Sequence, residues 1–75
     1  MQFKSNGWYW ISPRILPSLK LLTKYESAGR CSGKEAIIGH YYYKYDIFVS
    51  GMFALDEYFF REATDEEVVA YILEN

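Results

Sequence analysis

Residues 40–50 read HYYYKYDIFVS, and this stretch decides the fold that we expect for the 75-residue chain. The odd-numbered positions from 41 to 49 are all aromatic or β-branched, whereas the even-numbered positions include histidine, lysine, aspartate and serine. Such alternation is typical of a β-strand with one buried face. We therefore expect one strand over residues 40–50, with Tyr42 and Phe48 on its otherwise polar face.

The chain that follows predicts short antiparallel strands. Gly51 is expected to turn the chain, because glycine interrupts strand patterns. Residues 52–55 then form a return strand, and residues 58–61 form a third short strand. The acidic pair at positions 56 and 57 lies between these two segments and predicts a second turn.

A helix over residues 65–73 is specified by its own first turn. Thr64 and Glu67 match the capping box, in which the hydroxyl and the carboxylate each accept a hydrogen bond from the other residue's amide. Asp65 and Glu66 suit the positive start of the helix dipole. A helix of this length is unstable alone, so its apolar stripe must pack on the sheet. The stripe comprises Val68, Val69 and Ile72, with Tyr71 at its edge.

The first half of the chain is less regular. Asn6-Gly7 is a turn signal, and residues 8–11, WYWI, favour a strand that ends near Pro13. Residues 16–25 fit either a helical turn that starts at Pro17 or a proline-rich loop that leads into a strand; we favour the helical turn. Residues 27–34, SAGRCSGK, have the composition of a loop.

Together these segments predict one α+β domain over residues 1–75. We expect a small twisted antiparallel β-sheet, or an SH3-like partial barrel, closed by the C-terminal helix. The expected core comprises Trp10, Ile38, Tyr43, Tyr45, Ile47, Val49, Phe53, Phe60, Val68 and Ile72.

Charge is distributed unevenly along the chain. Residues 1–34 carry six basic residues and one acid, a net charge of +5, whereas residues 35–75 carry two basic residues and nine acids, a net charge of -7. This division predicts a dipolar surface if the two halves occupy separate faces. We favour the alternative, in which the fold interleaves the halves and the charges mix.

Aromatic residues make up 20% of the chain, which is the clearest indication of a binding function. Exposed aromatics beside Lys and Arg stack nucleic-acid bases in single-strand binders, and similar residues anchor protein interfaces. The net charge of -2 argues against a dedicated nucleic-acid binder, so we favour a protein partner. Self-association remains an open alternative. The candidate interaction surface comprises Trp8, Arg14, Lys20, Lys24, Arg30, Lys34, Tyr42 and Phe48.

No residue pattern indicates catalysis. Cys31 and His40 are the only cysteine and histidine, and they lack a recognisable catalytic signature. Residues 29–34, GRCSGK, fail the phosphate-loop spacing. We therefore expect no enzymatic activity, cofactor or metal. A single cysteine indicates a reducing compartment, and no apolar run approaches membrane-spanning length, so we expect a cytoplasmic protein without a membrane partner.

The run FFREATDEEVVAYI, residues 59–72, resembles the C-terminal end of small phage-encoded proteins. In these proteins a compact β domain, often SH3-like, closes with an F-R-x-A-T-x-E-E helix start. The resemblance covers about a fifth of the chain. It implies a viral accessory protein, made in the host cytoplasm, that binds and redirects a host enzyme or a defence component without catalysis. It implies no functional residues, because the shared residues look structural.

Overall fold

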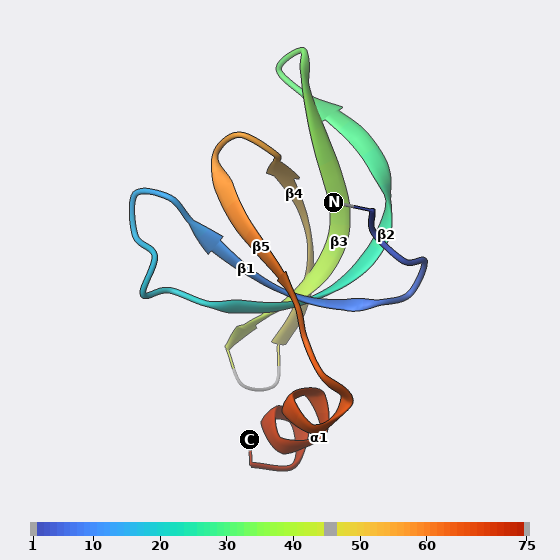
Figure 1. Cartoon of the computed structure of the whole chain (residues 1–75), viewed down its shortest axis with the longest axis vertical. Coiled ribbons are helices and arrows are strands. Elements are labelled where there is room, and N and C mark those ends of the chain that lie inside the picture. The colour runs from blue at the N-terminus through green and yellow to red at the C-terminus, as the bar shows by residue number, and fades with distance from the viewer. Residues whose placement is uncertain (1, 45–46, 75) are drawn as a thin grey trace.

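The computed structural model describes residues 2–44 and 47–74, which form a five-stranded antiparallel sheet and one helix (Figure 1). The elements are β1 (Trp8–Pro13), β2 (Leu21–Cys31), β3 (Lys34–Lys44), β4 (Ile47–Ala54), β5 (Tyr58–Glu62) and α1 (Asp65–Glu74). The strand order is β4-β3-β2-β1-β5, so the last strand returns to pair with the first. The expected antiparallel α+β arrangement with a C-terminal helix is confirmed.

The sheet buries side chains on both faces because successive residues of β1 point to opposite sides. Tyr9 and Ile11 belong to an inner cluster with Ile37 and Phe53. The neighbouring residues of β1, Trp8 and Trp10, face an outer cluster that α1 covers in part. The buried members of this outer cluster are Leu22, Ala63 and Val68.

Residues 40–44 and 47–50 belong to two different strands, so the prediction of one continuous strand is wrong. The end of β3 pairs with the start of β4, and Tyr42 lies opposite Phe48. The alternation persists across both strands because these two residues are an even number apart and share one face. The residues at positions 45 and 46 lie outside the described part of the chain.

Gly51, expected to turn the chain, lies inside β4 opposite Gly39. A Cβ atom added to Gly51 would lie 2.6 Å from Cε1 of Tyr41, so the absence of a side chain makes room for the tyrosine ring. The predicted turn at residues 56–57 and the short strand after it are confirmed.

Two predictions for the first half of the chain are also wrong. The loop expected over residues 27–34 is the end of β2, a turn at Ser32-Gly33 and the start of β3. Ser32 and Gly33 have φ values of 53° and 80°, as a two-residue hairpin turn requires. Residues 14–20 contain two turns in place of the favoured helical turn and lead into β2, which matches the alternative.

The expected core is confirmed at Phe53 and Val68, which are buried. It is wrong at three positions where side chains are exposed: Tyr43 at 62%, Ile47 at 45% and Ile72 at 46%. Tyr43 lies near the end of β3 and Ile47 begins β4, and neither belongs to the inner or the outer cluster. Ile72 is exposed because α1 contacts the outer cluster through Val68 and Tyr71. Trp10, Ile38, Val49 and Phe60 are half-buried, and Tyr45 lies outside the described residues.

The start of α1 forms the predicted capping box. The amide of Thr64 donates to Oε1 of Glu67 at 2.9 Å, and the amide of Glu67 donates to Oγ1 of Thr64 at 3.1 Å. Arg61, from β5, adds an ion pair in which its Nη2 lies 2.8 Å from Oε2 of Glu67. These bonds fix the direction in which the chain leaves the sheet.

The same contacts make Glu67 a source of acid sensitivity. The hydrogen bond from Arg61, together with that from the amide of Thr64, lowers the pKa of Glu67 from 4.5 to about 2. A depressed carboxyl pKa stabilises the fold above the unfolded pKa, and this stabilisation is lost as the pH falls towards the folded pKa. The loss is expected between pH 4.5 and about 2.

We expect Glu67→Gln to lower the melting temperature at pH 7 and to flatten its decline over that acid range. Thermal unfolding followed by circular dichroism at several pH values measures both effects. Glu74→Gln, which neutralises an acid at the other end of α1, is the control and should retain the wild-type slope. Identical acid profiles for the wild type and Glu67→Gln would contradict the assignment.

Candidate aromatic interaction surface

Three of the predicted site residues, Trp8, Tyr42 and Phe48, meet on the outer face of the sheet. The rings of Trp8 and Tyr42 are stacked with centroids 6.3 Å apart, and the ring of Phe48 lies 4.8 Å from Tyr42 and 6.1 Å from Trp8. His40 stacks on Phe48 at 5.4 Å. Nζ of Lys24 lies 5.9 Å from the centroid of Trp8, within cation–π range. We call these five residues the aromatic surface.

The strand register brings these side chains together. Trp8 pairs with Lys24, Lys24 with His40, and His40 with Ser50, so one row crosses β1, β2, β3 and β4. Tyr42 and Phe48 form the next cross-strand pair along β3 and β4. Side chains opposite each other on one face of a sheet lie within contact distance. The aromatic surface is therefore held by the central strands and not by a loop.

Groups of both charge signs lie at one side of the aromatic surface. Nδ1 of His40 lies 3.4 Å from Oε2 of Glu26, and both side chains are partly exposed. A shallow hollow of about 400 Å³ lies between these residues and Lys24, and its wall includes Phe48. A ligand here would meet aromatic rings beside one ammonium group and one carboxylate.

The other predicted site residues lie elsewhere. The guanidinium of Arg14 lies over Phe59 at 4.5 Å, next to the β1–β2 loop that carries Lys20. Arg30 and Lys34 flank the β2–β3 turn, which projects at the end of the molecule opposite α1 (Figure 1). Of the predicted basic residues, Lys24 is therefore the one that the structure places beside the rings of the aromatic surface.

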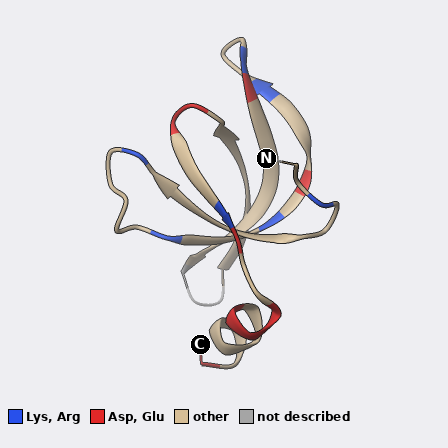
Figure 2. Ribbon diagram, viewed as in Figure 1, with Lys and Arg blue, Asp and Glu red and all other residues tan. Residues whose placement is uncertain are grey.

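The two oppositely charged halves of the sequence are mixed in space, as favoured (Figure 2). Nζ of Lys4 lies 3.4 Å from Oε1 of Glu62, and Nζ of Lys34 lies 3.3 Å from Oδ2 of Asp56. Each pair joins a basic residue of the first half to an acid of the second. These exposed pairs stabilise the fold little, but they break up the potential that a dipolar surface needs.

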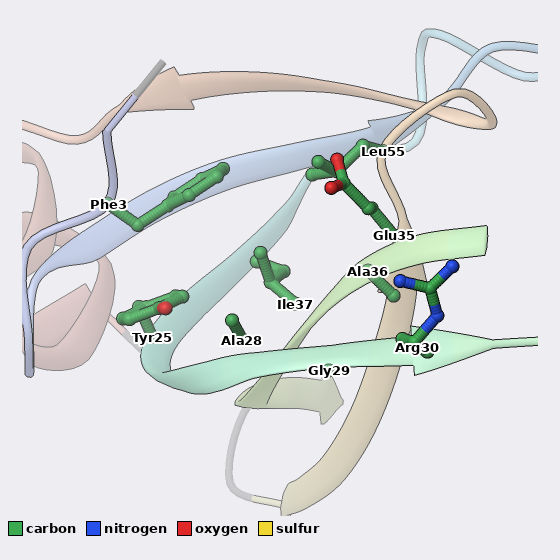
Figure 3. A pocket seen from close by; sticks show the side chains of 9 residues that line it. All are labelled: Phe3, Tyr25, Ala28, Gly29, Arg30, Glu35, Ala36, Ile37 and Leu55. Atoms are coloured by element: carbon green, nitrogen blue, oxygen red, sulfur yellow. The ribbon is translucent and has the colours of Figure 1, made fainter. Parts of the chain in front are cut away.

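A second hollow of about 470 Å³ is lined by residues of β2 and the start of β3, together with Phe3 and Leu55 (Figure 3). Figure 3 shows Phe3 and Tyr25 at one end of it, Arg30 and Glu35 at the other, and Ile37 between them. The rings of Phe3 and Tyr25 are stacked at 5.2 Å and close the inner cluster. This hollow opens onto the inner cluster, and no sequence pattern predicted it.

Sequence reasoning placed His40 on the polar strand face with Tyr42 and Phe48, but left it out of the candidate interaction surface and weighed it as a partner for Cys31. Cys31 pairs with Lys34 at the β2–β3 turn, whereas His40 lies further along β3 by about 20 Å at the usual rise per residue. The two side chains are therefore not neighbours. The spacing of His40 and Tyr42 could have indicated the correct role, since residues two apart share a strand face.

Residues 2–44 and 47–74 contain no group of three or more His, Cys, Asp or Glu side chains that could hold a metal ion. In the same residues, no helix is long and apolar enough to span a membrane. Comparison of the chain with protein-family models, curated proteins and solved structures found no match.

The exposure of Phe48, at 42%, predicts that it can be removed without loss of the fold. Phe48→Ala should lower the free energy of unfolding by about 1 kcal/mol through lost ring contacts. Phe53→Ala, a matched change in the inner cluster, should cost about 3–5 kcal/mol. Urea denaturation at pH 7 measures both values, and equal losses would contradict the distinction between surface and core.

Proposed function

We propose that this chain is a non-enzymatic binding protein whose aromatic surface holds a partner protein. The observation that carries the proposal is the group of stacked rings formed by Trp8, Tyr42 and Phe48 beside Lys24. Large aromatic side chains and cation–π pairs are characteristic of residues that dominate protein interfaces. We further propose that the chain is a phage accessory protein that modulates a host protein.

Pre-organisation supports binding at this surface. Association costs free energy when side chains lose rotational freedom on docking. Tyr42 and Phe48 are already held by each other and by Trp8, so their rings lose less freedom when a partner covers them. The shallow hollow beside His40 gives the partner a place for a projecting side chain.

The phage assignment rests on the resemblance of residues 59–72 to the closing helix of small phage proteins. It is supported by the order β4-β3-β2-β1-β5, which suits an SH3-like partial barrel because β5 returns beside β1. The single cysteine suits action in the reducing cytoplasm of a bacterial host. The proposed effect is takeover of a host protein or inhibition of a defence component.

Single-stranded nucleic acid is the second candidate for the same surface. Its bases would stack on Trp8, Tyr42 and Phe48, and Lys24 would contact a phosphate. The dispersal of the other predicted basic residues favours the protein partner, because a nucleic-acid backbone requires a basic groove that tracks it.

The protein-partner proposal predicts that capture depends on Phe48. Tagged wild-type protein should recover the same host protein repeatedly from bacterial lysate, and calorimetry with the purified partner should give its affinity. Phe48→Ala should weaken binding at least tenfold, the loss typical of an interface anchor. Phe59→Ala is a matched control, because Phe59 is exposed to 46% but lies on β5 beside Arg14. Equal affinities for both variants would remove the proposal.

Titration of a fluorescent oligonucleotide at low salt separates the two candidates. If the partner is a protein, we expect the oligonucleotide to show no salt-dependent binding. Salt-dependent binding that disappears in Phe48→Ala and falls in Lys24→Gln would instead assign the aromatic surface to single-stranded nucleic acid.

A further inference from the structure

The strand β4 has one unpaired edge. It ends the sheet order, and within the described part of the chain it pairs only with β3. The amide of Leu55 donates to the carbonyl of Glu35 at 2.9 Å, which fixes the phase of the β3–β4 ladder. Because hydrogen-bonded pairs alternate along antiparallel strands, the backbone groups of Phe48, Ser50 and Met52 point away from β3.

This edge lacks charge and proline, two features that normally prevent strand pairing. Native edge strands are short, charged or interrupted by proline. The eight residues of β4, IFVSGMFA, contain no charged residue and no proline. By contrast, the opposite edge strand β5 has five residues, of which Arg61 and Glu62 are charged. The edge of β4 is therefore the one suited to receive another strand.

We propose that the edge of β4 pairs with β4 of a second copy of this chain, antiparallel about a two-fold axis at Ser50. In this register Ser50 lies opposite Ser50 of the other copy, and Phe48 lies opposite Met52. The outward backbone groups of these three positions then complete a ladder of hydrogen bonds across the axis. The sheets of the two copies join into one continuous sheet.

The side chains make this pairing self-complementary. Phe48 and Met52 are exposed to 42% and 43% and stand at equal distances on either side of Ser50. Each phenylalanine of the dimer therefore meets a methionine across the strands, and sulfur–aromatic contacts are favourable. In an isologous interface, residue i of one copy contacts residue j of the other, and residue j contacts residue i in turn. A strand of another protein need not carry a methionine opposite Phe48.

The charge of β4 also favours a second copy. Like charges opposite each other destabilise a strand pair, and two β4 strands bring none together. An acidic or basic peptide would find no counter-charge on β4. The dimer lies beyond the proposed function, because it joins two copies of this chain along the edge of β4, whereas partner capture uses the aromatic surface on the sheet face. Phe48 contributes to both.

Sedimentation equilibrium over a wide range of protein concentrations tests the proposal. The apparent mass of the wild type should rise to twice that of the chain as concentration increases. Ser50→Lys, which places two ammonium groups face to face at the axis, should remain monomeric. Ser27→Lys is the matched control, because Ser27 is also exposed and lies on a strand, but on β2 away from this edge; it should dimerise as the wild type does.

Circular dichroism tests whether each variant is folded, and Met52→Lys replaces Ser50→Lys if the latter is not. A wild type that stays monomeric at every concentration overturns the proposal, as does a folded lysine variant that dimerises normally. Capture of a host protein by a monomeric Ser50→Lys variant would show that the dimer and the proposed function are separate properties.

Cross-linking tests the register. Opposed residues in a hydrogen-bonded antiparallel pair have Cα atoms about 5.5 Å apart, within disulfide range. In a Cys31→Ser background, Ser50→Cys should form a covalent dimer with a mild oxidant, whereas Ser27→Cys should not. A dimeric protein in which Ser50→Cys fails to cross-link, or cross-links no faster than Ser27→Cys, overturns the pairing at Ser50.

Discussion

The rest of the structure depends on the burial of β1 from both sides. Tyr9 and Ile11 are fully buried in the inner cluster, while Trp8 and Trp10 face the outer one. The hydroxyl of Tyr9 accepts a hydrogen bond from the amide of Lys4 at 2.6 Å, which ties the N-terminal segment to the core. Because β2 and β5 pair with opposite edges of β1, this one strand sets the positions of both clusters.

A chain this short buries a smaller share of its unfolded surface than a larger domain does, and that limit explains where the apolar residues go. The helix covers part of the outer cluster through Val68 and Tyr71 and leaves Val69 and Leu73 exposed. Nε1 of Trp10 is buried under this cover without a hydrogen-bond partner among the described residues. The outer cluster therefore contains a buried polar group whose hydrogen bonding is not satisfied by the described residues. The aromatic surface begins at the side of this cluster that the helix leaves uncovered, at Trp8 and Tyr42.

The two proposals use different properties of the paired strands β3 and β4. The rings of Tyr42 and Phe48 offer apolar area and stacking on the sheet face, whereas the backbone of β4 offers hydrogen bonds at the sheet edge. Phe48 belongs to both, because its side chain lies on the aromatic surface and its backbone lies on the free edge. A dimer would bring two aromatic surfaces onto one continuous sheet face, so a partner with repeated contacts would bind with added avidity.

The sequence alone determined the features that depend on near neighbours. The capping box of α1 needs only Thr64 and Glu67, and the first strand needs only the Asn6-Gly7 turn and its aromatic run; both were predicted. The short strand after the turn at 56–57 follows from the same local rules. A resemblance confined to a capped helix start could suggest a source for the protein, but it could not place a site.

Only the tertiary structure decided where the chain reverses and which side chains meet. The alternation with a period of two continues from β3 into β4, because Tyr42 and Phe48 share one face, so the sequence of residues 40–50 could not reveal that two strands are present. The grouping of Trp8, Lys24 and Phe48 depends on register across four strands. Local sequence patterns fix which face of a strand a side chain occupies, but they do not fix which strands pair, so they could not bring these three residues together.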